Sequence, residues 1–169
     1  MSKIGLFYGT QTGNTEQIAF MIQEEIGKDM VDIHDMSDVK VGDFAEYQHL
    51  IIGVPTWNDG ELSSDWEAFS PELDDIDFNG KTVAYFGVGD QTGYPDTFMD
   101  AIGILEAKIS SLGGKTVCPW STDGYDFEVS KGVRDGKFIG LALDENNQGD
   151  LTESRIKTWT GQVKQAFSV

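Results

Sequence analysis

The sequence contains a single cysteine, Cys118, and therefore lacks the pairs from which internal disulfides form. A disulfide framework is excluded, and one unpaired thiol suits a reducing cytoplasm. Cys118 lies in the apolar stretch KTVCPW, with no second cysteine or histidine pattern nearby to activate its thiol. We interpret it as a small buried side chain in a strand.

Long apolar runs are also absent. No stretch approaches the roughly 18 apolar residues of a membrane-spanning helix, and the N-terminus lacks the basic and apolar regions of a signal peptide. We therefore expect a cytoplasmic protein without membrane insertion. With 169 residues, 39% of them hydrophobic and 11% aromatic, we expect one domain, 1–169, that buries its core without disulfides or metal.

Basic residues are scarce: 12 lysines and arginines stand against 29 aspartates and glutamates, giving a formal net charge of −17. Nucleic acids and anionic membranes would repel such a chain, so we expect neither as a partner. The acidity favours docking to basic protein surfaces. Solubility alone explains the same composition equally well.

Strand-like and helix-like segments alternate along the chain. The stretch HLIIGV, 49–54, is apolar throughout, which is typical of a parallel strand buried on both faces. The predicted strands are 3–8, 30–35, 49–54, 82–88 and 115–120, with 138–143 as a continuation or neighbour of the last. The predicted helices are 14–27, 63–73, 96–113 and 151–167, with Asp96 and Thr152 as candidate caps. This alternation predicts a doubly wound parallel α/β fold.

Three loops follow predicted strands: GTQTGNT (9–15), PTWNDG (55–60) and GVGDQTGY (87–94). Ligands of doubly wound sheets bind beyond the carboxyl ends of the strands, where these loops would meet. The first loop carries glycines, hydroxyls and amides directly into a helix N-terminus, which favours phosphate binding. It lacks the G-x-x-x-x-G-K-[ST] pattern and its lysine, so we expect a phosphate that is held rather than transferred.

Two aromatic residues, Trp57 and Tyr94, stand just past strand ends in glycine-flanked loops. Large aromatics in such positions suit stacking on the two faces of a flat heterocycle that the backbone approaches closely. The alternative is that they are ordinary, partly buried loop residues. We assign Trp66, Trp120 and Trp159 to the core, since Trp159 falls on the apolar stripe of its helix.

The three loops, in this order, resemble those of the flavodoxins, and the resemblance covers the whole chain. It is to the long-chain subgroup, in which a long insertion interrupts the fifth strand, and PWSTDGYDFEVSKGVRDGK (119–137) occupies that place. The resemblance implies a three-layer, doubly wound, five-stranded parallel sheet of order 2-1-3-4-5. It also implies one tightly but non-covalently bound FMN and no enzymatic activity. The function it implies is a low-potential, one-electron carrier that shuttles mainly between semiquinone and hydroquinone.

The resemblance also assigns roles to residues. Trp57 and Tyr94 would enclose the isoalloxazine ring, the Asn58–Asp59 peptide would face flavin N5, and Asp90 would meet the pyrimidine edge. The phosphate would lie among Thr10, Gln11, Thr12, Gly13, Asn14 and Thr15. Further contacts would come from Pro55, Thr56, Gly60, Val88, Gly89 and Thr97, with Asn146 at the ribose. The chain departs from the usual family pattern at Asp59, Val88, Thr97 and Met99, which leaves the side-chain contacts at the ring edge open.

Acidic residues lie in or beside these loops: Asp59, Asp65, Glu67, Asp90 and Asp100. Fully reduced FMN tends to become an anion, and nearby carboxylates raise the free energy of that anion. These carboxylates should therefore lower the reduction potential of the semiquinone–hydroquinone couple. We expect a monomer that docks to basic surfaces of redox proteins such as photosystem I, ferredoxin–NADP reductase, nitrogenase components or biosynthetic reductases.

Two other classes share the fold, and one further class stays open. A quinone reductase needs a substrate pocket over the flavin, whereas Trp57 and Tyr94 would cover both ring faces. A phospho-acceptor receiver domain needs an acidic pair after its first strand and an aspartate after its third, and YGTQTG and VPTW supply neither. A binding module without cofactor remains the open alternative. His34 and His49 lack metal-ligand spacing, so we expect no metal site and assign them structural roles.

Overall fold

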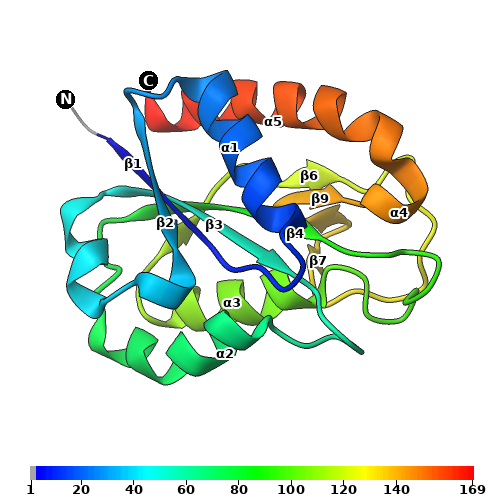
Figure 1. Ribbon diagram of the computed structural model, residues 1–169, viewed down its shortest axis with the longest axis horizontal. Coiled ribbons are helices and arrows are strands. Elements are labelled where there is room, and N and C mark those ends of the chain that lie inside the picture. The colour runs from blue at the N-terminus through cyan, green and yellow to red at the C-terminus, as the bar shows by residue number, and fades with distance from the viewer. Residues whose placement is uncertain (1–2) are drawn as a thin grey trace.

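A parallel sheet runs through the middle of the computed structural model, which describes residues 3–169 (Figure 1). Its strands are β1 (Ile4–Tyr8), β2 (Val31–Asp35), β3 (His49–Pro55), β4 (Thr82–Val88), β5 (Lys115–Thr116) and β9 (Leu141–Leu143). Their order is β2-β1-β3-β4-β5, with β9 also paired to β4, and all of these pairs are parallel. The predicted doubly wound order 2-1-3-4-5 is confirmed.

Helices cover both faces of this sheet. In Figure 1, α1 (Asn14–Ile26) and α5 (Thr152–Phe167) lie above it, whereas α2 (Ser64–Phe69) and α3 (Asp100–Ser111) lie below. The short helix α4 (Glu145–Gln148) follows β9. Short 3-10 helices span Met36–Asp38, Val41–Glu46, Ser70–Asp75 and Gly149–Leu151.

Each face of the sheet buries its own apolar cluster, and neighbouring residues of β3 alternate between them. Leu50 and Ile52 pack in the cluster under α2 and α3, which also contains Trp66. Ile51 packs in the cluster under α1 and α5, which also contains Trp159. All five side chains are fully buried. The apolar run of β3 therefore packs against the core on both faces of the sheet, as the sequence predicts.

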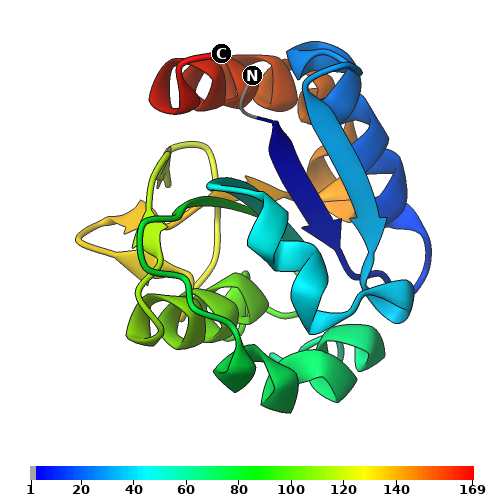
Figure 2. The same cartoon turned by 90° about the vertical axis from the view of Figure 1, so that its left-hand side faces the viewer.

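The fifth strand position is split, as the resemblance implies. β5 and β9 both pair with β4, and the chain between them leaves the sheet. That segment forms a second, antiparallel sheet of order β6-β8-β7 from Trp120–Ser121, Lys137–Phe138 and Val133–Arg134. It lies at the edge of the main sheet formed by β5 and β9, on the opposite side of the molecule from β2 (Figure 2).

Three predicted details at this edge are wrong. The strands predicted over 115–120 and 138–143 pair with β4 only at 115–116 and 141–143, because Trp120 and Phe138 pair with each other instead. Cys118 is buried as predicted, yet it lies outside any strand, with a φ of 62°. Burial raises the pKa of its thiol to about 11. Trp120 is only partly buried, unlike the core tryptophans.

Two helix starts also differ from prediction. α3 begins at Asp100 rather than near Asp96, because a tight turn precedes it: Thr97 N donates to Tyr94 O, and Asp100 N donates to Thr97 O. Met99 then takes a left-handed conformation, with a φ of 62°. Thr152 is the first residue of α5 rather than its cap, and its hydroxyl donates to Glu145 instead.

The two histidines make structural contacts. His34 Nε2 lies 2.8 Å from the Tyr47 hydroxyl, and its ring stacks on Phe7. His49 Nδ1 lies 2.8 Å from the Thr82 hydroxyl. Among residues 3–169, no three acidic, histidine or cysteine side chains gather as a metal site, and no helix has the length and apolar character to cross a membrane.

Candidate cofactor site

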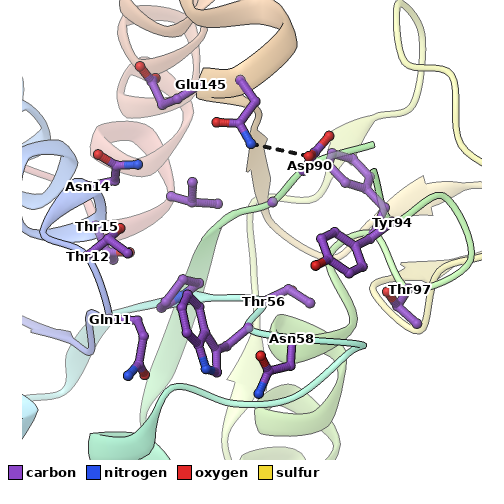
Figure 3. A pocket seen from close by; sticks show the side chains of 16 residues that line it. Gln11, Thr12, Asn14, Thr15, Thr56, Asn58, Asp90, Tyr94, Thr97 and Glu145 are labelled. Carbon is purple, nitrogen blue, oxygen red and sulfur yellow. Dashed lines mark hydrogen bonds between the residues drawn. The ribbon is translucent and has the colours of Figure 1, made fainter. Parts of the chain in front are cut away.

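The carboxyl ends of β1, β3 and β4 open onto a cavity of about 480 Å³ (Figure 3). This size suits a cofactor or other small ligand. The predicted site residues that line it are Gln11, Thr12, Asn14, Thr15, Pro55, Thr56, Trp57, Asn58, Val88, Gly89, Asp90, Tyr94, Thr97 and Asn146. Phe98 and Glu145 also line it and were not predicted. The three loops therefore meet around one cavity, together with the start of α4.

Four predicted site residues lie outside the cavity lining: Thr10, Gly13, Asp59 and Gly60. Thr10 and Gly13 shape the first loop, because the Thr10 hydroxyl accepts a hydrogen bond of 2.8 Å from Gly13 N. Gly13 precedes α1 with a φ of 94°, a conformation that suits glycine. Asp59 is exposed at the tip of the second loop.

One end of the cavity is rich in unpaired hydrogen-bond donors. Within residues 3–169, the backbone N–H groups of Gln11, Thr12, Asn14 and Thr15 find no acceptor, and the buried Thr15 hydroxyl has no partner. Figure 3 places these four side chains together on one side of the cavity. The Thr15 hydroxyl is a buried group without a partner, which is rare in folded proteins. The free N–H groups around it lie at a helix N-terminus, where they favour an anion. This end therefore fits a phosphate group.

The other end carries two aromatic side chains that remain partly exposed. Trp57 is 36% exposed and Tyr94 47% exposed, although both residues line the cavity. Most large aromatics of this chain are buried, so these two have apolar surface that no protein atom covers. The arrangement fits a flat ligand that contacts both.

The loop after β3 is a closed hairpin. Trp57 N donates to Glu61 O at 2.7 Å, and Glu61 N donates to Trp57 O at 2.8 Å. Inside the hairpin, Asn58 has a φ of 48° and Gly60 a φ of 87°. The Asn58 side chain also donates to Glu61 Oε2 at 3.0 Å. This turn depends on two residues that tolerate left-handed backbone.

The start of α3 supports this hairpin from below. The Thr56 hydroxyl accepts a hydrogen bond from Ala101 N, and a Cβ on Gly60 would lie only 3.0 Å from Asp100 Oδ2. Asp100 is buried, and its carboxylate accepts a 2.7 Å hydrogen bond from Lys131 N. Burial raises the pKa of Asp100. A side chain at Gly60 would press on Asp100 and Thr97, and it would also be strained by the left-handed backbone there.

The carboxylate of Asp90 holds the third loop together. It accepts hydrogen bonds from Thr92 N, from Gly93 N and from the side chains of Asn146 and Asn147 on α4. The bond from Gly93 and those from the two amides lower the pKa of Asp90. Asn146, which the resemblance placed at the ribose, directs its amide to Asp90.

A further carboxylate, Asp65, supports the first loop. It accepts hydrogen bonds from Thr10 N at 2.9 Å and from the Ser63 hydroxyl at 2.5 Å. A Cβ on Gly9 would lie 2.3 Å from Trp66 and 2.5 Å from Asp65, so the loop rests directly on the start of α2. The first loop is thus fastened to the start of α2.

Comparison with known proteins identifies the family. The family model described as "Flavodoxin" matches residues 6–159. The chain is 65% identical to a flavodoxin of Nostoc sp. over 167 residues, covering 99% of this chain and 98% of the relative. It is 46% identical to flavodoxin 1 of Escherichia coli over 166 residues, covering 98% and 94%.

A solved structure, the flavodoxin of Fusobacterium nucleatum bound to flavin mononucleotide, is similar throughout. It superposes with a TM-score of 0.93 at 37% identity, covering 98% of this chain and 99% of that one. Oxidised flavodoxin 2 of Bacillus cereus superposes with a TM-score of 0.74 at 26% identity, covering 98% and 100%. The chain belongs to the flavodoxin family of FMN-containing electron-transfer proteins, which are not enzymes.

Proposed function

We propose that this chain binds one FMN non-covalently in the cavity at the carboxyl ends of β1, β3 and β4. The observation that carries the proposal is the pairing of two unlike ends in one cavity. Unpaired N–H groups and the Thr15 hydroxyl lie at one end, and the partly exposed Trp57 and Tyr94 lie at the other. FMN has the matching parts, a phosphate and a flat ring.

Different residues would contact different parts of FMN. The N–H groups and hydroxyls of the first loop would hold the phosphate, and Trp57 and Tyr94 would stack on the ring. The Asn58–Asp59 peptide would face flavin N5, with Thr56, Gly60, Val88 and Gly89 around the ring. FMN supplies the redox chemistry, and the chain supplies binding, orientation and electric field.

We further propose that the bound flavin works mainly between its half-reduced and fully reduced states, at low potential. Asp65, Asp90 and Asp100 have carboxylates fixed by hydrogen bonds around the three loops. Each negative charge raises the free energy of an anionic, fully reduced ring more than that of a neutral one. The last reduction step should therefore be the least favourable, which makes the reduced carrier a strong donor.

The partners that we propose are basic faces of redox proteins in the cytoplasm, such as photosystem I, ferredoxin–NADP reductase or nitrogenase components. The net charge of −17 supports this choice. We propose that the carrier acts as a monomer and exposes only the edge of the ring between its two aromatic side chains.

The test is reconstitution followed by stepwise reduction. The apoprotein should take up one equivalent of FMN, and photoreduction should pass through a long-wavelength-absorbing, half-reduced state. Potentiometry should then give two separated one-electron potentials, the second more negative than that of free FMN. Protein that takes up no FMN would remove the proposal. Uptake of FMN with a single two-electron step would remove only the proposed redox cycle.

A further inference from the structure

Two buried polar residues, Gln91 and Asp144, lie behind the cavity without lining it. Asp144 is fully buried and Gln91 is 3% exposed. Gln91 is in the loop after β4, and Asp144 follows β9 and caps α4. A buried carboxylate is costly unless hydrogen bonds compensate it, so the partners of Asp144 indicate what it does.

Asp144 gathers four hydrogen bonds from two segments. Its Oδ2 accepts from Gln91 Nε2 at 2.8 Å, from Gln91 N at 3.1 Å and from Asn147 Nδ2 at 2.9 Å. Its Oδ1 accepts from Asn147 N at 3.0 Å. The carboxylate therefore joins the loop after β4 to the first turn of α4.

Gln91 extends this connection into the insertion. Its Oε1 accepts a hydrogen bond of 2.6 Å from Asp126 N, while its Nε2 and backbone N–H both donate to Asp144. The polar atoms of the Gln91 side chain are thus both used, one toward the insertion and one toward α4. Three segments that are distant in sequence meet at this one amide.

From Asp144 the hydrogen bonds continue to the aromatic end of the cavity. Asn147 Nδ2 donates both to Asp144 and to Asp90 Oδ1, the latter at 2.8 Å. The backbone oxygen of Asp90 accepts from Tyr94 N at 2.9 Å. The loop that carries Tyr94 is therefore fixed at Gln91 by Asp144 directly, and Asp144 also holds the Asn147 amide that donates to Asp90.

We infer that Gln91 and Asp144 are positioning residues for the flavin ring, which they serve by fixing the backbone of 90–94 and so the place of Tyr94. This inference rests on the proposed function, because the ring must bind beside Tyr94 for the loop position to affect affinity. The phosphate end belongs to other segments, the first loop and α1. Loss of the network should therefore weaken ring binding selectively.

The variant that tests this is Asp144→Asn. Both carboxylate oxygens of Asp144 now accept hydrogen bonds. An asparagine replaces one of these oxygens with an NH2 group, which cannot accept, so at least one N–H group of Gln91 or Asn147 loses its acceptor. Binding of FMN, riboflavin and inorganic phosphate to the full-length apoprotein is measured by titration. Riboflavin has the ring without the phosphate. We expect the Kd values of FMN and riboflavin to rise by the same factor, roughly tenfold or more, and that of phosphate to stay unchanged.

Two further variants separate position from charge and from folding. Asp150→Asn removes one charge from an exposed residue of the next turn, and it should leave the riboflavin Kd within about twofold of the original. The double variant Gln91→Glu with Asp144→Asn exchanges amide and carboxylate across the same contact, and it should recover part of the lost affinity. If Asp144→Asn does not fold, Gln91→Ala carries the same test, because it leaves the carboxylate three of its donors.

The outcomes distinguish this inference from the proposed function. An unaltered protein that binds no FMN contradicts the proposed function itself. If FMN binds but riboflavin affinity is unchanged in both Asp144→Asn and Gln91→Ala, the positioning role is wrong. Equal weakening of phosphate and riboflavin would also overturn it, since that pattern means general loosening of the fold.

Discussion

Asn58 adopts a left-handed backbone conformation, with a φ of 48°, in the hairpin that closes between Trp57 and Glu61. Asparagine tolerates this conformation, whereas a β-branched residue does not. We expect Asn58→Val to destabilise the apoprotein by about 1–2 kcal/mol, measured by urea unfolding. Asn58→Gly is the matched control, because it loses the same hydrogen bond to Glu61 without the strain. Equal stability of the two variants would mean that backbone strain at this turn is unimportant.

Trp57 and Tyr94 keep a large part of their surface exposed beside the cavity. If they stack on the ring of FMN, truncation of either to alanine should weaken FMN binding by about 1–3 kcal/mol, the range for one stacking aromatic. Fluorescence titration of the apoproteins measures this. Phe20→Ala is the control, because Phe20 is 51% exposed and does not line the cavity. Unchanged affinity in both ring variants would contradict the stacking assignment.

Asp100 shows how a buried charge under the hairpin affects stability. Burial raises its pKa in the folded protein, so its protonated form favours folding and its ionised form opposes it. This contribution is fully present below the unfolded pKa, near 4, and is lost as the pH rises through the folded pKa. Asp100→Asn keeps an oxygen for Lys131 N and removes the charge. We expect it to be more stable than the original protein at pH 7 and equally stable near pH 3, measured by urea unfolding.

At the scale of elements, one ion pair fastens the insertion to α3. Arg134 of β7 donates to both carboxylate oxygens of Glu106, at 3.0 and 2.5 Å, and Thr116 donates a third hydrogen bond. Burial alone would raise the pKa of Glu106, yet these bonds lower it on balance. Glu106 is 3% exposed, whereas the Arg134 side chain is 55% exposed.

Removal of Arg134 alone should therefore lower the free energy of unfolding more than removal of both Arg134 and the charge of Glu106. We expect Arg134→Met to destabilise the protein by about 1–3 kcal/mol, because Glu106 keeps a buried charge without its cation. The double variant with Glu106→Gln should recover part of this loss. Urea unfolding of both variants measures the difference. A double variant no more stable than the single one would show that Glu106 is adequately solvated without Arg134.

The elements that the sequence predicts best are those with long, regular patterns. The sequence places α1 and β4 within one residue of their observed ends, because helix periodicity and an apolar run are local signals. The start of α3 and the extents of the two parts of the fifth strand are predicted wrongly. They depend on the turn at Thr97 and on the pairing of Trp120 with Phe138, which residue patterns do not reveal.

The candidate site follows the same division. Motifs at three strand ends predict where the cavity lies, because parallel strands bring their carboxyl ends together. The positions of Phe98 and Glu145 in its lining, and the hydrogen bonds between Gln91 and Asp144, were not predicted. Those residues meet only through tertiary packing, although DENNQ after an apolar strand is a readable helix start for α4.

At the scale of the whole molecule, most of the negative charge is not neutralised internally. In the part of the chain that the structure describes, ion pairs involve only four of the 29 acidic residues, Glu24, Asp32, Asp74 and Glu106. The remaining carboxylates act together at long range, since potentials of like charges add. A basic partner should therefore be attracted before any specific contact forms.

This attraction predicts a salt dependence of electron transfer. The Debye length falls to about 10 Å at 0.1 M ionic strength and to about 3 Å at 1 M, so steering should fade over this range. We expect the bimolecular rate with a basic partner, such as ferredoxin–NADP reductase, to fall by at least tenfold as salt rises from 0.1 to 1 M, within the roughly 10–1,000-fold range of steering. Below 0.1 M the rate can pass through a maximum, because very tight complexes hold some molecules in unproductive orientations. Stopped-flow mixing measures the rate, with an uncharged small-molecule oxidant as the control whose rate should not change. A partner rate as indifferent to salt as that control would mean that the acidity serves solubility and does not guide docking.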